Sequence, residues 1–176
     1  MTNIERNADV VEMATYAPLF AHVEGWQWRP DMIWYDNSRS VRTASYYVQQ
    51  LFSHNKGTNT ASLTMDGKAI AGNEDQAGLF ASAVYDATAN AYIVKAANVS
   101  DTAQSVTISL DGLASDKQIA SASITTLHCD NPDADNTLDA PETVVPETHE
   151  LANVSGSKFN TTLNAQTFYV IRLALK

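Results

Sequence analysis

The fold class is set by the stretch Leu79-Phe-Ala-Ser-Ala-Val-Tyr-Asp86, which Ala87-Thr-Ala-Asn90 connects to Tyr92-Ile-Val-Lys-Ala-Ala-Asn98. Positions 79, 81, 83 and 85 alternate with 80, 82, 84 and 86, and a period of two is typical of a β-strand. Because the connecting segment is short, the two strands are expected to pair antiparallel. The stretch therefore predicts a β-hairpin.

Similar segments lie on both sides of this hairpin, separated by turn residues such as Asp111-Gly112. They are rich in β-branched and aromatic side chains, as strands are. We expect strands at residues 61–65, 106–110, 119–127, 159–163 and 167–175. Six to eight strands at such regular spacing predict an antiparallel β-sandwich of the jelly-roll kind. Residues 129–150, rich in Asp and Pro, are expected to form a long surface excursion.

The first 57 residues have a different pattern. Helical spacing of Ile4, Ala8, Val11 and Ala14 predicts a helix over residues 3–15. Pro18 ends that period, and the apolar run over residues 16–23 is typical of a short strand buried on both faces. A second helix is predicted from the N-cap Thr43 to residues 56–57. Two helices and a short strand thus precede the sandwich, as in a piece of an α/β layered fold.

Composition divides the 176 residues in the same way. Residues 1–57 hold nine of the fifteen aromatic side chains and a net charge of −1, whereas residues 58–176 have a net charge of −8. An overall charge of −9 argues against nucleic acid or an anionic membrane as a partner. The single Cys129 excludes an internal disulfide. The N-terminal residues lack a secretory signal, so we expect an intracellular rather than a secreted protein.

The usual arrangements for catalysis or metal binding are missing from the pattern. Cys129 has only His128 beside it, and neighbouring side chains on a strand point to opposite faces. The four histidines have no metal-ligand spacing. Asp130, Asp133 and Asp135 could hold Ca²⁺, but the Gly and distal Glu of a calcium loop are absent, which favours a solvated acidic loop. The sequence predicts no catalytic residue, no metal and no cofactor.

The most suggestive position is Glu24, which follows the predicted strand and precedes Gly25-Trp-Gln-Trp28. A carboxylate beside aromatic rings at the C-terminal end of a strand is typical of sugar sites in α/β barrels. The alternative is that Trp26, Trp28 and Trp34 cap a core. One carboxylate is in any case not the pair that a glycosidase needs.

Three stretches in this region resemble one family. They are Met13-Ala-Thr-Tyr-Ala-Pro-Leu-Phe-Ala-His-Val23, Trp26-Gln-Trp-Arg-Pro-Asp-Met-Ile-Trp-Tyr-Asp-Asn37 and Ser45-Tyr-Tyr-Val-Gln-Gln-Leu-Phe-Ser-His-Asn-Lys-Gly57. They look like the C-terminal part of family 51 glycoside hydrolases, the α-L-arabinofuranosidases. The resemblance is dense over residues 8–57 and weaker beyond, where residues 136–145 and 159–173 also look like the family's β-domain.

The resemblance implies a fragment of a retaining glycosidase. Residues 1–57 would be the last helix, strand and helix of a (β/α)₈ barrel, and residues 58–176 its C-terminal sandwich. The family's two catalytic glutamates would precede residue 1, so the fragment itself is expected to be inactive. His22, Glu24, Trp26, Gln27 and Trp28 would follow the eighth barrel strand and are candidate substrate contacts. The parent would hydrolyse terminal non-reducing arabinofuranosyl residues of arabinose-containing oligo- and polysaccharides.

Two other functions stay open at this point. One is a carbohydrate-binding module with Tyr85 or Tyr92 as a sugar platform, and the other is a structural sandwich that contacts the missing barrel portion or forms a homo-oligomer. If residues 16–23 are a barrel strand without its neighbours, its edges and apolar faces are uncovered. We then expect this segment to rearrange, to pack on the sandwich or to pair with another chain.

Overall fold

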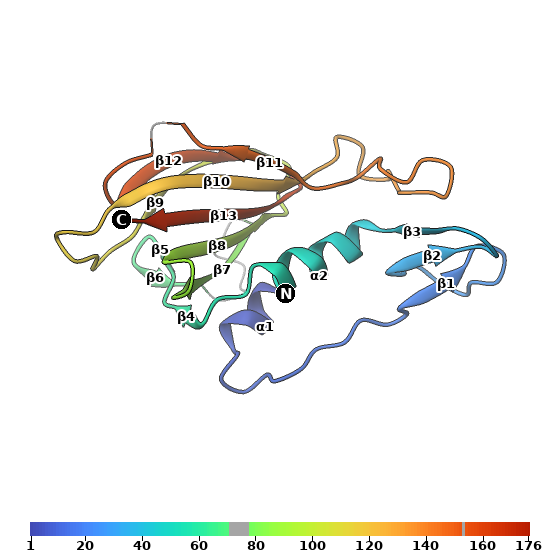
Figure 1. Ribbon diagram of the computed structural model, residues 1–176. Coiled ribbons are helices and arrows are strands. Elements are labelled where there is room, and N and C mark those ends of the chain that lie inside the picture. Colours follow the sequence, from blue (N-terminus) through green and yellow to red (C-terminus); the bar gives the residue numbers. More distant parts are fainter. Residues whose placement is uncertain (71–77, 153) are drawn as a thin grey trace.

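The computed structural model describes residues 1–70, 78–152 and 154–176. Over these residues the largest sheet has six strands in the order β11-β10-β13-β8-β7-β4 (Figure 1). All neighbouring strands in it pair antiparallel. Its strands are β4 (Asn59–Ala61), β7 (Leu79–Asp86), β8 (Ala91–Asn98), β10 (Ile119–Leu127), β11 (Glu147–Glu150) and β13 (Thr167–Leu175).

The predicted hairpin is present as β7 and β8, with Tyr85 opposite Tyr92. The bounds of β10 and β13 agree with the predicted strands, and β12 (Lys158–Leu163) begins one residue before its prediction. β9 (Gln104–Ser109) begins two residues earlier and ends one residue earlier than expected. The segment predicted at 61–65 divides into β4 and β5 (Thr64–Met65), and β5 pairs with β6 (Lys68–Ala69).

Alternate residues of the large sheet face two different layers. On one face the core includes Ala83, Val94 and Ile171, packed against side chains of the β9–β12 pair and of β5. On the other face Val84, Ile93 and Val170 pack against α2 (Ala44–His54). The mainly β, sandwich-type fold predicted from the strand spacing is confirmed, and α2 forms an additional layer over the sheet.

The helix α2 begins where the sequence predicted. Its N-cap is Thr43, whose Oγ1 atom accepts a hydrogen bond from the backbone N–H of Tyr46 at 3.4 Å. Tyr47, Leu51 and Phe52 form its buried face. This helix connects the sandwich to a small sheet at the far end of the molecule (Figure 1).

The small sheet has the order β1-β2-β3, with β1 (Phe20–His22), β2 (Ile33–Tyr35) and β3 (Ser40–Arg42). β1 pairs parallel with β2, and β2 pairs antiparallel with β3. Ala21, Trp34 and Val41 form its buried core. Leu19, Phe20 and Val23 are exposed by 46%, 58% and 37%. The segment therefore keeps a parallel strand with uncovered apolar side chains, and the expectation that it would rearrange or pack on the sandwich is wrong.

The predicted helix over residues 3–15 is also wrong beyond its first turn. The helix α1 spans only Thr2–Arg6, and an extended stretch leads from it to β1 (Figure 1). An isolated helix of this length is marginal in water without a packing partner. Of the predicted apolar face, Ile4 is 36% exposed and Ala8 and Ala14 are exposed as well, so most of the face that would stabilise the predicted helix is not packed here. Within the described residues, no helix is both long and apolar enough to cross a bilayer.

Candidate functional site

The residues that connect β1 to β2, numbers 23–32, form what we call the aromatic loop. It begins after His22, whose ring packs edge-on against Tyr35 with the ring centroids 5.2 Å apart. The backbone N–H of Glu24 donates a hydrogen bond to Nδ1 of His22 at 3.2 Å. Because Nδ1 accepts this bond, a neutral His22 carries its proton on Nε2.

Trp26 and Arg29 of this loop form a compact group with Trp34 of β2. The rings of Trp26 and Trp34 are perpendicular, with centroids 5.7 Å apart. The guanidinium carbon of Arg29 lies 5.2 Å from each of the two ring centroids. A guanidinium at this distance is attracted by the negative faces of both indoles. Trp34 is 8% exposed and belongs to the small core, whereas Trp26 is 46% exposed.

A cleft of about 420 Å³ separates the aromatic loop from the excursion between β10 and β11. Glu24, Arg29 and Trp34 line one wall, together with Asp36 and Arg39 at the end of β2 and the start of β3. Residues 135–139 of the excursion line the other wall. The cleft thus lies between two segments that are about a hundred residues apart in the sequence.

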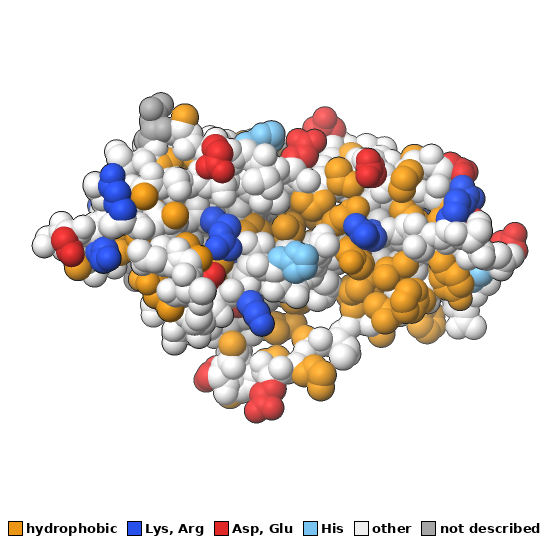
Figure 2. All heavy atoms as spheres, viewed as in Figure 1, with side chains coloured by type: hydrophobic (Ala, Val, Ile, Leu, Met, Phe, Trp, Pro, Cys, Tyr) orange, Lys and Arg blue, Asp and Glu red, His pale blue; other side chains and the backbone are white. Residues whose placement is uncertain are grey.

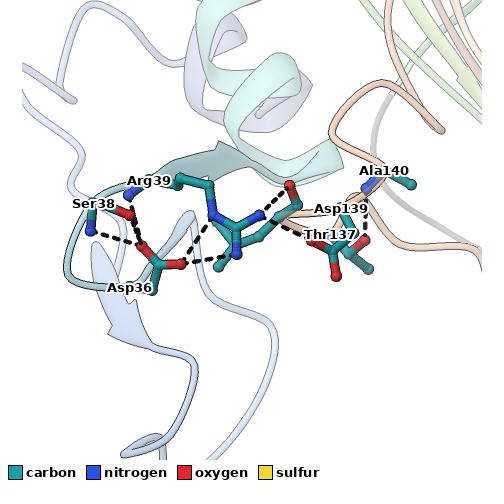
Figure 3. Close-up of polar contacts among 7 residues, drawn as sticks. Asp36, Ser38, Arg39, Thr137, Asp139 and Ala140 are labelled. Atoms are coloured by element: carbon teal, nitrogen blue, oxygen red, sulfur yellow. Dashed lines mark hydrogen bonds and ion pairs between the residues drawn. The ribbon is translucent and has the colours of Figure 1, made fainter.

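The polar contacts in this cleft are centred on Arg39 (Figure 3). Its Nε donates to Asp36 Oδ2 at 3.0 Å, and its Nη1 donates to Asp139 Oδ1 at 2.9 Å. Asp36 also accepts backbone N–H bonds from Ser38 at 2.7 Å and from Arg39 at 2.6 Å. These two backbone bonds are the main reason that the pKa of Asp36 falls from 3.8 to about 2. Asp36 is therefore ionised at neutral pH.

The structure brings only some of the predicted site residues into contact. His22 and Glu24 share a hydrogen bond, Glu24 lines the cleft, and Trp26 joins the ring group. Gln27 and Trp28 are exposed, Trp28 by 59%, and within the described residues neither side chain makes a hydrogen bond or ring contact. Sequence reasoning missed Arg29, Arg39 and Asp139. An arginine next to two tryptophans is a signal that could have indicated Arg29.

The other sites considered from the sequence have structural explanations. Cys129 is half-buried and packs against the cluster under α2. Asp130 contacts His128 at 3.0 Å and Asp135 contacts Arg29 at 2.7 Å. Across residues 1–70, 78–152 and 154–176, no three metal-ligating side chains lie close enough to hold an ion.

Tyr85 and Tyr92, the alternative sugar platform, pack against one another. Their ring centroids are 5.0 Å apart, and the hydroxyl of Tyr85 donates to Asn90 Oδ1. Tyr92 also packs against the sandwich core. This arrangement is that of a cross-strand pair rather than of two rings presented to a ligand.

A family model described as the α-L-arabinofuranosidase C-terminal domain matches residues 1–166. The chain belongs to this family. The match covers the small sheet, α2 and the sandwich as far as the residue before β13. Membership of the α-L-arabinofuranosidase C-terminal domain family confirms the resemblance stated from the sequence.

Named relatives agree with this result. The chain is 34% identical over 173 residues to α-L-arabinofuranosidase A of Aspergillus kawachii, an alignment that covers 97% of this chain and 25% of the relative. It is 54% identical over 57 residues to an extracellular exo-α-L-arabinofuranosidase of Streptomyces chartreusis, with 32% of this chain and 7% of the relative covered. The chain therefore spans about a quarter of the length of the Aspergillus relative.

Solved structures share the fold. An arabinose-bound GH51 α-L-arabinofuranosidase superposes with a TM-score of 0.84 at 30% identity, which covers 100% of this chain and 26% of the other. The GH51 arabinofuranosidase of Xanthomonas axonopodis pv. citri has a TM-score of 0.71 at 19% identity, covering 97% and 33% of the two chains. The second match supports the fold alone.

Proposed function

We propose that this chain acts as the C-terminal portion of a longer α-L-arabinofuranosidase that removes terminal non-reducing arabinofuranosyl residues from arabinose-containing oligo- and polysaccharides. Family membership and the fourfold greater length of the Aspergillus relative support this proposal. In it, residues 1–57 are the end of the catalytic barrel and residues 58–176 are an accessory sandwich.

The observation that carries the proposal is that β1 has an open edge and exposed apolar side chains around it. In the described residues it pairs only with β2, in parallel, so its other edge is open. Parallel strands are normally covered on both faces and flanked on both edges, as in a closed barrel. Leu19, Phe20 and Val23 instead remain exposed. A barrel strand that lacks its preceding neighbours has these properties.

The chemistry requires groups from the rest of such a barrel. A retaining glycosidase uses two carboxyl groups about 5 Å apart on either side of the glycosidic bond. Glu24 is the carboxylate of the aromatic loop that lines the cleft, and we assign it a binding rather than a catalytic role. His22, Glu24, Trp26, Gln27 and Trp28 are the substrate contacts in this proposal, located where β1 ends, as loops are in barrel enzymes.

A chimera tests the proposal. The matching C-terminal quarter of the Aspergillus kawachii enzyme is replaced with this chain, and hydrolysis of 4-nitrophenyl α-L-arabinofuranoside is measured. The chimera is expected to release arabinose, because this chain completes its barrel. The chain alone and the truncated relative are expected to be inactive.

Two results would contradict the proposal. The first is turnover by the isolated chain at a rate comparable to the intact relative. The second is a chimera that is folded and monodisperse, by circular dichroism (CD) and size-exclusion chromatography, but inactive. A chimera that contains Trp28→Ala separates folding from binding, since the exposed Trp28 side chain contributes to no described contact and is expected to affect KM alone.

A further inference from the structure

The excursion predicted over residues 129–150 ends in β11, and its residues 129–146 pack against the small sheet. Leu138 packs against the core formed by Ala21, Trp34 and Val41. Asn136 is 4% exposed, and its amide nitrogen donates to the backbone carbonyl of Arg42 at 2.8 Å. A segment of the sandwich thus completes the hydrophobic core beneath the aromatic loop.

Two ion pairs extend this contact to the solvent side. Arg29 Nη1 lies 2.7 Å from Asp135 Oδ2, and Arg39 Nη1 lies 2.9 Å from Asp139 Oδ1. In both pairs the arginine comes from the first 57 residues and the aspartate from the excursion. Of the three aspartates that the sequence suggested as a solvated loop, Asp135 therefore binds an arginine near the proposed sugar site.

The Asp135–Arg29 pair differs from the other because of what Arg29 touches. Its guanidinium lies 5.2 Å from the ring centroids of both Trp26 and Trp34. Trp34 is fixed in the core, so Arg29 links the exposed indole of Trp26 to a rigid neighbour. Asp135 holds the guanidinium from the side of the excursion. Removing the carboxylate releases Arg29, and with it one of the contacts that orient Trp26.

We propose that Asp135 is a positioning residue, which acts through Arg29 to hold the Trp26 indole as a stacking platform for a pentose ring. This rests on the proposed function, which places Trp26 among the substrate contacts. Figure 2 shows that hydrophobic side chains gather on the surface over the small sheet and the aromatic loop. Trp26, Trp28, Tyr35 and Phe20 are among the exposed large hydrophobic residues of this region. An indole face of this kind suits the apolar face of a sugar ring.

The Arg29–Asp135 pair orients Trp26 rather than stabilising the fold as a whole. The side chains of Arg29 and Asp135 are 58% and 54% exposed, and an ion pair that is this exposed contributes little to the free energy of unfolding. Arginine suits the position because its planar guanidinium can pair with a carboxylate and stack on rings together, which an ammonium does not do. Lysine at position 29 is therefore not an adequate substitute.

The test uses the full chain and five variants. Near-UV CD of the wild type minus that of Trp26→Phe defines the signal of the Trp26–Trp34 pair. Asp135→Asn and Arg29→Lys are compared with the control Asp133→Asn, whose side chain makes no hydrogen bond or ion pair among the described residues and is exposed. Each protein is also titrated with arabinotriose by isothermal calorimetry. Urea unfolding checks that all variants are folded.

We expect Asp135→Asn and Arg29→Lys to reduce the Trp26 CD signal and to raise the Kd for arabinotriose about two- to fivefold, the range of one exposed cation–π contact. Asp133→Asn is expected to match the wild type in both measurements, and Asp135→Glu to restore most of the signal.

Equal CD spectra for Asp135→Asn and Asp133→Asn would overturn the positioning role. If arabinotriose binds Trp26→Phe and the wild type equally, or binds neither, the platform role of Trp26 is overturned, together with its place in the proposed site. The CD comparison needs no sugar, so the two failures are distinguishable.

Discussion

The ammonium nitrogen of Lys95 lies 2.5 Å from Oε1 of Glu5 and joins the central strand β8 to the N-terminal helix α1. The Lys95 side chain has no solvent exposure, and that of Glu5 has 13%. Ser82 Oγ donates to the second carboxylate oxygen at 2.6 Å. Lys95 Nζ also lies 5.3 Å from the ring centroid of Phe52 in α2. Both helices are thus attached to one polar cluster on the helix-covered face of the large sheet.

Removing only one partner of this pair is expected to be costly. Glu5→Gln leaves the buried Lys95 ammonium without a counter-charge, which typically lowers the free energy of unfolding by about 3 kcal/mol. The double variant Glu5→Leu with Lys95→Met removes both charges and is expected to be more stable than Glu5→Gln. Urea unfolding followed by circular dichroism measures both values. A double variant less stable than Glu5→Gln would refute this account of the cluster.

Lys95 also makes stability depend on pH. Burial lowers the pKa of Lys95 below its ordinary value of 10.5, although Glu5 partly opposes this shift. Between the two pKa values, the unfolded chain binds a proton that the folded chain does not. Stability from this group therefore rises with pH up to about 10.5 and is lost as the pH falls through the lowered pKa. The free energy of unfolding of the wild type relative to Lys95→Met should rise over this interval. A difference that stays constant with pH would argue against the burial effect.

The strands were the most predictable part of the fold. In β7 and β8 four consecutive residues in the middle of each strand are buried, because each strand separates two layers, and the period of two along the sequence assigns these residues to the two faces. The helix predicted over residues 3–15 failed for the opposite reason. Its apolar spacing is real, but Ala8 and Ala14 are exposed in the structure, and a pattern carries no information about whether its packing partner is present.

The candidate site was only partly predictable. Glu24 and Trp26 could be predicted as site residues, because they follow a strand that the sequence indicates. Asp135 and Asp139 could not, because their arginine partners lie 106 and 100 residues away in the chain. Such long-range pairing depends on the path of the excursion across the small sheet. The acidic composition of that segment is equally consistent with a solvated loop.

The lowered pKa of Asp36 predicts a second dependence of stability on pH, in the acidic range. Backbone N–H bonds from Ser38 and Arg39 lower the pKa of Asp36 from 3.8 to about 2. Its contribution to stability is fully present above 3.8 and is lost as the pH falls through about 2, because the unfolded chain takes up the proton first. Relative to Asp36→Asn, the wild type should lose stability between pH 4 and pH 2 in urea unfolding. Asp133→Asn is the control, and an unchanged difference across this interval would contradict the assignment.

Asn136 is expected to be the most sensitive residue of the excursion. Its amide donates to the carbonyls of Arg42 at 2.8 Å and Val144 at 2.9 Å, and its Oδ1 accepts from the N–H of Val144 at 2.6 Å. Asn136→Ala leaves these buried backbone groups unpaired and should lower the free energy of unfolding by about 2–3 kcal/mol. Thermal unfolding of this variant beside Asp133→Asn measures the loss. A melting temperature equal to that of the control would show that water replaces these bonds without cost.

Gly57 connects α2 to β4, and the chain there approaches β7 too closely for any side chain. A Cβ atom at this position would lie 2.6 Å from the carbonyl oxygen of Tyr85 and 2.6 Å from Cβ of Val84. The close approach lets the N–H of Thr58 donate to the Tyr85 carbonyl at 2.7 Å. The Tyr85 carbonyl oxygen belongs to the backbone of β7 and cannot move without the strand. Gly57→Ala must therefore shift α2 away from the sheet. We expect it to lower the free energy of unfolding by about 1–3 kcal/mol.

Gly25→Ala, where nothing lies within 4 Å of the added atom, is the matched control and should be neutral in the same urea unfolding experiment. Equal stability of the two variants would mean that α2 is not fixed against β7 at this point.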